Sequence, residues 1–245
     1  MGQGNQQVTC GRWTRSRIAA LCLAAVAASC STTQQVPIKQ AEIQTDNKCG
    51  LLGEDCNRLT PGQEGQASLR YVNPTASWSQ YQKILIEPVT FWGSNTTQVS
   101  AQDQQALVNY CQQVLHEELS KKFPLADQVG PGVMRLQVAI IDATAATPGM
   151  RTVSMVVPQA RTLNTLKYAA TGTYAFVGGA EGEMKLTDAA TGQLLAAAMD
   201  KRIGGGSLET AAQWKWGDAE NAMKAWAVQL TDRLSSWTSG AAKPS

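Results

Sequence analysis

The sequence has a single histidine, His116, so any mechanism that needs an imidazole base depends on this one residue. The segment that starts at His116 begins like the helix of a zinc protease, but Ser120 stands where the second histidine ligand is required. The chain also lacks the Gly-x-Ser-x-Gly turn that carries the nucleophile of many serine hydrolases. We interpret His116 as a polar residue beside the apolar stripe of a helix, and we predict no catalytic residue.

Runs dense in lysine and arginine are absent, which argues against a nucleic-acid partner. The chain carries 21 Lys+Arg and 19 Asp+Glu, a formal charge of +2. Residues 1–29 hold three of the arginines and no acid, so the remainder carries 18 basic and 19 acidic groups. The glycine clusters at 178–179 and 204–206 match neither phosphate-binding nor dinucleotide-binding patterns, so no cofactor is expected.

No apolar run reaches the roughly 20 residues that a membrane-spanning helix needs. The run from 18 to 28 follows three arginines and leads into small residues before Cys30, a pattern typical of a cleaved signal peptide. A cysteine at this place resembles the lipobox of bacterial lipoproteins, which is acylated, with palmitate among the chains, and becomes the new N-terminus. We predict a lipoprotein signal peptide over residues 1–29 and lipidation of Cys30. An ordinary signal peptide that ends near a cysteine is the alternative.

The residue after the cysteine indicates the destination of such a lipoprotein. An aspartate there tends to mark retention in the inner membrane, whereas this chain has Ser31. We therefore expect the periplasmic side of the outer membrane of a Gram-negative bacterium, with the acyl chains as the membrane anchor.

Three other cysteines lie outside the signal segment. Cys49 and Cys56 flank two glycines and could close a small disulfide loop, worth about 2–3 kcal/mol on the loop-entropy model. No histidine is near them, so we expect no metal site. Cys111 falls on the apolar stripe of an expected helix and is interpreted as a buried free thiol.

The polarity of the chain divides it into four parts. Residues 1–29 are the signal peptide, and residues 30–69 are polar and rich in turns, as expected of a lipidated flexible tether with the small cysteine loop. Alternatively, part of this segment packs on the domain through Leu51 and Leu52. Residues 70–238 form the α/β domain, and residues 239–245 a disordered tail.

Hydrophobic periodicity predicts the elements of the domain. Apolar residues at 84–86 suggest a central strand, and Pro88 places the rest of that strand at an edge or bulge. The expected strands are 83–92, 133–142, 152–157, 167–177, 180–188 and 193–203, and the expected helices are about 100–122 and 218–237. Ser100 and Asp103 have the spacing of a capping box, and Asp188 precedes a hairpin turn expected at 189–192. The last helix places Trp226, Leu230, Leu234 and Trp237 on one apolar stripe. Two amphipathic helices can cover one face of such a sheet. The expected fold is an α/β two-layer sandwich, with a mixed, mostly antiparallel sheet and both helices on one face.

Several phrases, taken in order, resemble a family of uncharacterised proteobacterial lipoproteins whose domain has no known function. They include Tyr71-Val-Asn-Pro-Thr-Ala-Ser-Trp78, Leu136-Gln-Val-Ala-Ile-Ile-Asp-Ala143, Thr187-Asp-Ala-Ala-Thr-Gly-Gln-Leu-Leu-Ala196 and Trp216-Gly-Asp. The resemblance covers about residues 70–237. It implies a secreted, usually lipid-anchored protein and brings no catalytic residues.

These patterns favour a non-enzymatic binding or scaffolding module of the cell envelope, with an envelope protein as partner. Trp214 and Trp216 would share a face if extended and could anchor that partner, although core packing is the alternative. A second hypothesis is a carrier of a small apolar or lipid ligand. A third is a hydrolase of envelope polymers that uses carboxylates, for which the candidates are Asp142, Glu181, Glu183, Asp188 and Asp200.

Overall fold

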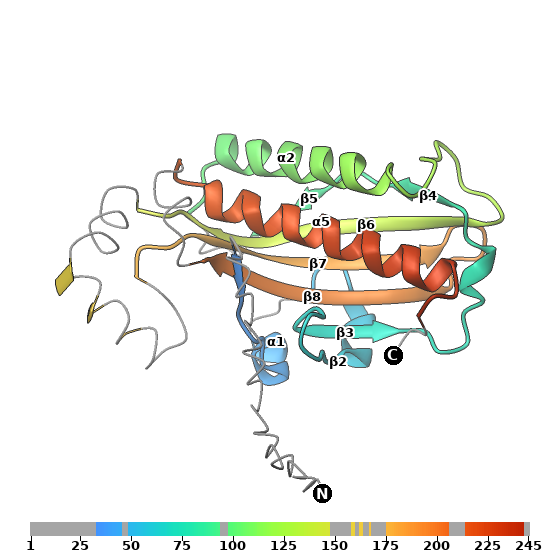
Figure 1. The fold of residues 1–245 in the computed structure, drawn as a ribbon, viewed down its shortest axis with the longest axis horizontal. Coiled ribbons are helices and arrows are strands. Elements are labelled where there is room, and N and C mark those ends of the chain that lie inside the picture. The colour runs from blue at the N-terminus through green and yellow to red at the C-terminus, as the bar shows by residue number, and fades with distance from the viewer. Residues whose placement is uncertain are drawn as a thin grey trace, which may run out of the picture.

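The computed structural model describes residues 33–45, 49–93, 98–147, 175–205 and 214–242, together with 158–159, 162–163 and 167. One long sheet carries two long helices along one face (Figure 1). The strands are β1 (Thr33–Gln35), β2 (Thr60–Pro61), β3 (Leu69–Val72), β4 (Lys83–Ile86), β5 (Thr90–Phe91), β6 (Val133–Thr144), β7 (Gly179–Asp188) and β8 (Leu194–Gly204). The helices are α1 (Gln40–Thr45), α2 (Ala101–Leu119) and α5 (Gly217–Thr238).

The sheet has the spatial order β2-β3-β8-β7-β6-β4, with β1 added to β8 and β5 added to β6. Of these strands, β4 and β5 run parallel to their partner β6, and the other pairs of named strands are antiparallel. The long strands β6, β7 and β8 form its centre, and a turn at 189–192 joins the last two, as predicted. The prediction of a mixed, mostly antiparallel sheet is therefore confirmed.

The expectation of a central strand at 84–86 is wrong, because β4 is the last strand of the sheet path. Its apolar side chains are explained instead by the packing of α2, since Ile84 is fully buried in the same core as Leu115. Pro88 separates β4 from β5, as its missing donor predicts.

Both long helices cover the same face of the sheet (Figure 1). Ser100 caps α2, since its hydroxyl accepts a hydrogen bond from the backbone N–H of Asp103, as the capping-box spacing predicts. Cys111 lies buried on the inner side of α2, and burial raises the pKa of its thiol to about 12. Among the described residues, no helix is both long and apolar enough to cross a bilayer.

The opposite face of the sheet is covered by the segment predicted to be a flexible tether, so that prediction is wrong for its described part. The strand β1 pairs with β8 in the register Thr33↔Gly204, and α1 and the 3₁₀ helix Gly53–Arg58 follow beneath the sheet (Figure 1). These residues form a second apolar core with the sheet, made of Ile38, Ile43, Leu52, Cys56, Leu59, Leu69, Ile141, Leu194, Ala197 and Met199. The domain therefore begins by Thr33 and not near residue 70, and the packing alternative describes the segment better.

Other predicted segments lie outside the described residues. These include the signal peptide, the strand expected at 152–157 and most of the strand expected at 167–177. The described end of that last segment is a turn, in which Phe176 has a positive φ of 62°. The tail expected to be disordered begins with an ordered helix cap, since Gly240 (φ 73°) donates its N–H to the carbonyl of Trp237.

Candidate functional site

The two tryptophans predicted as a possible partner anchor do not lie on one exposed face. The chain turns into α5 at residues 215–216 instead of staying extended, so the shared face does not form. Trp216 is buried in the main core, as the packing alternative predicted, whereas Trp214 is 48% exposed. The indole N–H of Trp214 donates to the carboxylate of Glu220 over 2.9 Å. Cys30 lies outside the described residues.

A cavity of about 130 Å³ lies between α5 and the sheet, and we call it the α5 pocket. Its floor is a row of directly paired residues, because Arg70 of β3 pairs with Ala198 of β8, Ala198 with Met184 of β7, and Met184 with Val138 of β6. Paired residues in an antiparallel sheet project from the same face, so this row lies on one face and lines the pocket.

Small side chains on the floor leave the space that the pocket occupies. Ala196 and Ala198 line it from β8, and Gly182 lines it from β7. Gly182 also admits the ring of Trp226, since a Cβ there would lie 3.1 Å from a ring carbon of that indole. The Trp226 N–H donates to Asp200 over 2.9 Å, which fixes the ring against the sheet.

The wall opposite the floor comes from one stripe of α5. Trp226, Leu230, Leu234 and Trp237 line the pocket at the helical spacing that the sequence predicted. The lining is mainly apolar, with polar groups confined to a few positions, as is usual for sites that bind small molecules. An engineered apolar cavity of about 150 Å³ stays dry and binds benzene, so the α5 pocket is large enough for a small apolar group.

The rim of the pocket is polar and is built on the turn at 63–66. Arg70 donates to the side-chain oxygen of Gln66 over 3.1 Å, and Arg233 donates to the carbonyl of Gly65 over 3.0 Å. Gln229 of α5 donates to the same carbonyl of Gly65. The rim therefore joins α5 to the edge of the sheet.

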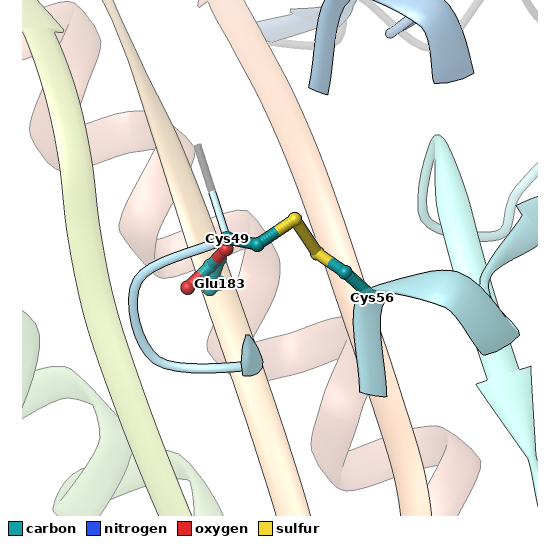
Figure 2. A group of neighbouring side chains, drawn as sticks. All are labelled: Cys49, Cys56 and Glu183. Carbon is teal, nitrogen blue, oxygen red and sulfur yellow. A yellow bond between two sulfur atoms is a disulfide. The ribbon is translucent and has the colours of Figure 1, made fainter. Parts of the chain in front are cut away.

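A second group of interest lies on the opposite face, where Glu183 of β7 approaches the cysteine loop (Figure 2). Cys49 and Cys56 are joined in a disulfide, in the pairing that their spacing suggests. One oxygen of Glu183 accepts the backbone N–H groups of Leu51 and Leu52 over 2.7 and 3.3 Å. Because the sulfur atoms are bonded to each other, they offer a metal ion no thiolate, and we assign this group a structural role.

Burial dominates the chemistry of Glu183, which is 1% exposed. Desolvation raises the pKa of its carboxyl to about 7, aided by the charge of Glu181, while the two backbone N–H groups act in the opposite direction. Glu181 faces the same side, is also buried, and pairs with Lys201 over 3.3 Å.

The remaining candidate carboxylates have structural partners. Asp188 accepts the N–H groups of Ala190 and Thr191 in the hairpin turn, as predicted for an aspartate at that place. Asp200 is bonded by four groups, from Gln35, Ser68, Arg202 and Trp226. Asp142 accepts the N–H of Ala143. His116 is exposed on α2, with its ring 2.7 Å from the side-chain nitrogen of Gln112.

Sequence reasoning missed the α5 pocket, although it found the helix stripe that forms one wall. The signal for the floor is the run of three alanines at 196–198, taken together with Gly182. That signal can be interpreted only when the pairing of β7 with β8 is known, because the pairing decides which small residues face α5.

A match to a protein family defines the class of protein to which this chain belongs. Residues 50–230 match the family described as "Protein of unknown function (DUF3313)", and the chain belongs to that family. It is also 25% identical, over 139 residues, to the "Uncharacterized lipoprotein YdcL" of Escherichia coli strain K12 and of strain O157:H7. That match covers 56% of this chain and 59% of the relative's length. The predicted resemblance to a lipoprotein family of unknown function is confirmed.

Two solved structures show a distant likeness of fold. The PelC dodecamer of Paraburkholderia phytofirmans is 10% identical with a TM-score of 0.35, and the match covers 66% of this chain and 94% of that one. The protein XCC0632 of Xanthomonas campestris is 12% identical with a TM-score of 0.34, with 70% and 95% covered. A likeness at this level supports no inference about function.

Proposed function

We propose that this chain is an envelope lipoprotein, anchored through Cys30, whose domain binds a small apolar ligand in the α5 pocket without transforming it. The lipoprotein part is supported by the signal-peptide pattern and by the similarity to YdcL. The binding part rests on one observation, the apolar cavity between α5 and the small residues of the sheet.

The other functions that the sequence suggested have less support from the geometry. Of the two tryptophans meant to hold an envelope protein, only Trp214 is exposed. The hydrolase hypothesis needs two carboxylates in an open cleft, but Glu181 and Glu183 are buried beneath the N-terminal segment. We therefore base the proposal on the pocket, and we place the protein on the periplasmic side of the outer membrane because Ser31 follows Cys30.

Replacement of Cys30 by alanine is expected to move the protein from the membrane fraction to the soluble periplasmic fraction. Two acyl chains give stable attachment, and without the thiol neither the thioether nor the chains can form. Fractionation of cells with and without C30A checks this, and the mass of the purified native chain shows the acyl groups directly. An unchanged distribution between the fractions would reject the anchor.

Filling the pocket is expected to abolish ligand binding. In Ala198→Leu the added carbons occupy the space above the floor, at an overpacking cost of about 1–3 kcal/mol. Benzene and 1-hexanol are suitable probes, and the indole N–H resonances of Trp226 and Trp237 should shift on titration because both rings line the pocket. The same change at the exposed Ala106 on α2 is the matched control.

The control variant should bind both probes as the natural protein does. Indole resonances that do not move in the natural protein, or that move equally in A198L, would contradict the proposal. Thermal unfolding of A198L and A106L shows whether each variant is folded.

A further inference from the structure

Two arginines with positive charges stand at the rim of the α5 pocket. Arg70 comes from β3 and Arg233 from α5, and both line the pocket. Each guanidinium donates to a neutral oxygen, that of Gln66 or of Gly65. Within the part of the chain that the structure describes, neither arginine forms an ion pair.

One carboxylate of the lining, that of Asp200, is already paired. Asp200 lines the pocket, but it forms an ion pair with Arg202 over 3.0 Å and accepts hydrogen bonds from Gln35, Ser68 and Trp226. Glu183 is also part of the lining strand, yet its carboxylate points to the opposite face, toward Leu51 and Leu52. The charge left over at the rim is therefore that of the two arginines.

The two guanidinium groups carry like charges and repel each other. Burial lowers the pKa of Arg70, and the like charge of Arg233 lowers it further. Arginine nonetheless stays protonated. The free-energy cost of the repulsion and of the lost hydration is therefore not relieved by loss of a proton. A bound anion would reverse the cost, because it would give both groups an opposite charge.

We infer that the α5 pocket binds a single-chain amphiphile with an anionic head, whose apolar part enters the cavity and whose head lies between Arg70 and Arg233. This inference rests on the proposed function and adds the class of ligand. The planar fork of arginine suits carboxylate and phosphate oxygens, and two such forks from different elements can hold one head. The apolar part is limited to a short segment by the cavity of about 130 Å³.

A matched set of six-carbon probes tests the head group separately from the chain. Hexanoate, 1-hexanol and hexylammonium share the apolar part and differ in charge. We expect hexanoate to bind about tenfold more tightly than hexanol, since a hydrogen bond to a charged group is worth more than a neutral one, and hexylammonium to bind least. The indole resonances of Trp226 and Trp237 report all three titrations.

Two conservative variants locate the effect. Arg70→Gln and Arg233→Gln should each weaken hexanoate binding about tenfold and leave hexanol binding within about twofold, because only the anion uses the guanidinium groups. Arg135→Gln is the matched control, since this arginine pairs with Glu87 and does not line the pocket. Retained hexanol binding shows that each variant is folded and keeps its pocket.

The outcomes distinguish failure of the anionic-head inference from failure of the proposed apolar binding in the α5 pocket. If hexanol and hexanoate bind alike, or if R70Q and R233Q bind hexanoate as the natural protein does, the anionic head is rejected while the apolar pocket stands. If none of the probes binds, both are rejected. A further titration with hexyl phosphate distinguishes a phosphate head from a carboxylate head, by which of the two anions binds more tightly.

Discussion

A chain that begins at Arg70 is expected not to fold, although the sequence pattern alone would start the domain there. Removal of the residues before it strips the second core and exposes Ile141, Leu194 and Met199 of the sheet to water. Full burial of one leucine or isoleucine side chain is worth about 1.5–3 kcal/mol. Loss of Ile43, Leu52 and Leu59 together removes about 5–9 kcal/mol, which is comparable with the whole stability of a domain.

Thermal unfolding followed by circular dichroism checks this prediction, with a chain of residues 31–245 as the reference. The shorter chain should show no cooperative transition and little soluble yield. A milder test is Leu59→Ala, which should cost about 2–5 kcal/mol because that side chain is 1% exposed. Val129→Ala is the matched control, since Val129 is 61% exposed. Equal melting temperatures for the two chain lengths would contradict this prediction and would support a flexible tether instead.

The second large effect is a loss of stability as the pH rises, caused by Glu183. Its pKa is raised from the model-peptide value of 4.5 to about 7 in the folded protein, so the folded state binds the proton more tightly than the unfolded state. The stabilisation by the protonated group is complete below about pH 4.5 and is lost as the pH rises through about 7. The expected loss is on the order of 2 kcal/mol.

Glu183→Gln isolates this effect, because an amide oxygen can still accept the N–H groups of Leu51 and Leu52 but has no proton to lose. Denaturant unfolding at pH 5 and pH 8 should show that the natural protein loses about 2 kcal/mol more than E183Q over this interval. Glu117→Gln, at an exposed position of α2, should follow the natural protein. Parallel pH profiles for E183Q and the natural protein would show that the carboxyl is not the titrating group.

Local patterns predicted the elements that have long, regular periods. The two helices, the strands β6, β7 and β8 and the cap at Ser100 agree with the structure because each depends on neighbouring residues. The place of β4 at the edge was not predictable in this way, since burial by a helix and burial between strands give the same apolar run. The N-terminal segment was misjudged for a related reason, because its buried residues are too widely spaced to form a period.

The site was predicted less well than the fold. The stripe of α5 was visible in the sequence, but the pocket also needs Gly182 and Ala198, which are brought together by strand pairing. Arg70 and Arg233 of the rim are 163 residues apart in the sequence, and no local pattern connects them. Sites assembled from distant strands and helices leave little trace in a single sequence.

The pairing of β1 with β8 has a consequence for how the protein meets the bilayer. Three residue steps separate Cys30 from Thr33, a reach of at most about 11 Å. With acyl chains on Cys30, the end of the sheet where Thr33 faces Gly204 stays close to the lipid headgroups. On the proposed anchor, the domain is held close to the membrane instead of on a long tether, and Ala198 on the floor of the α5 pocket lies six residues, about 20 Å, along β8 from that end of the sheet.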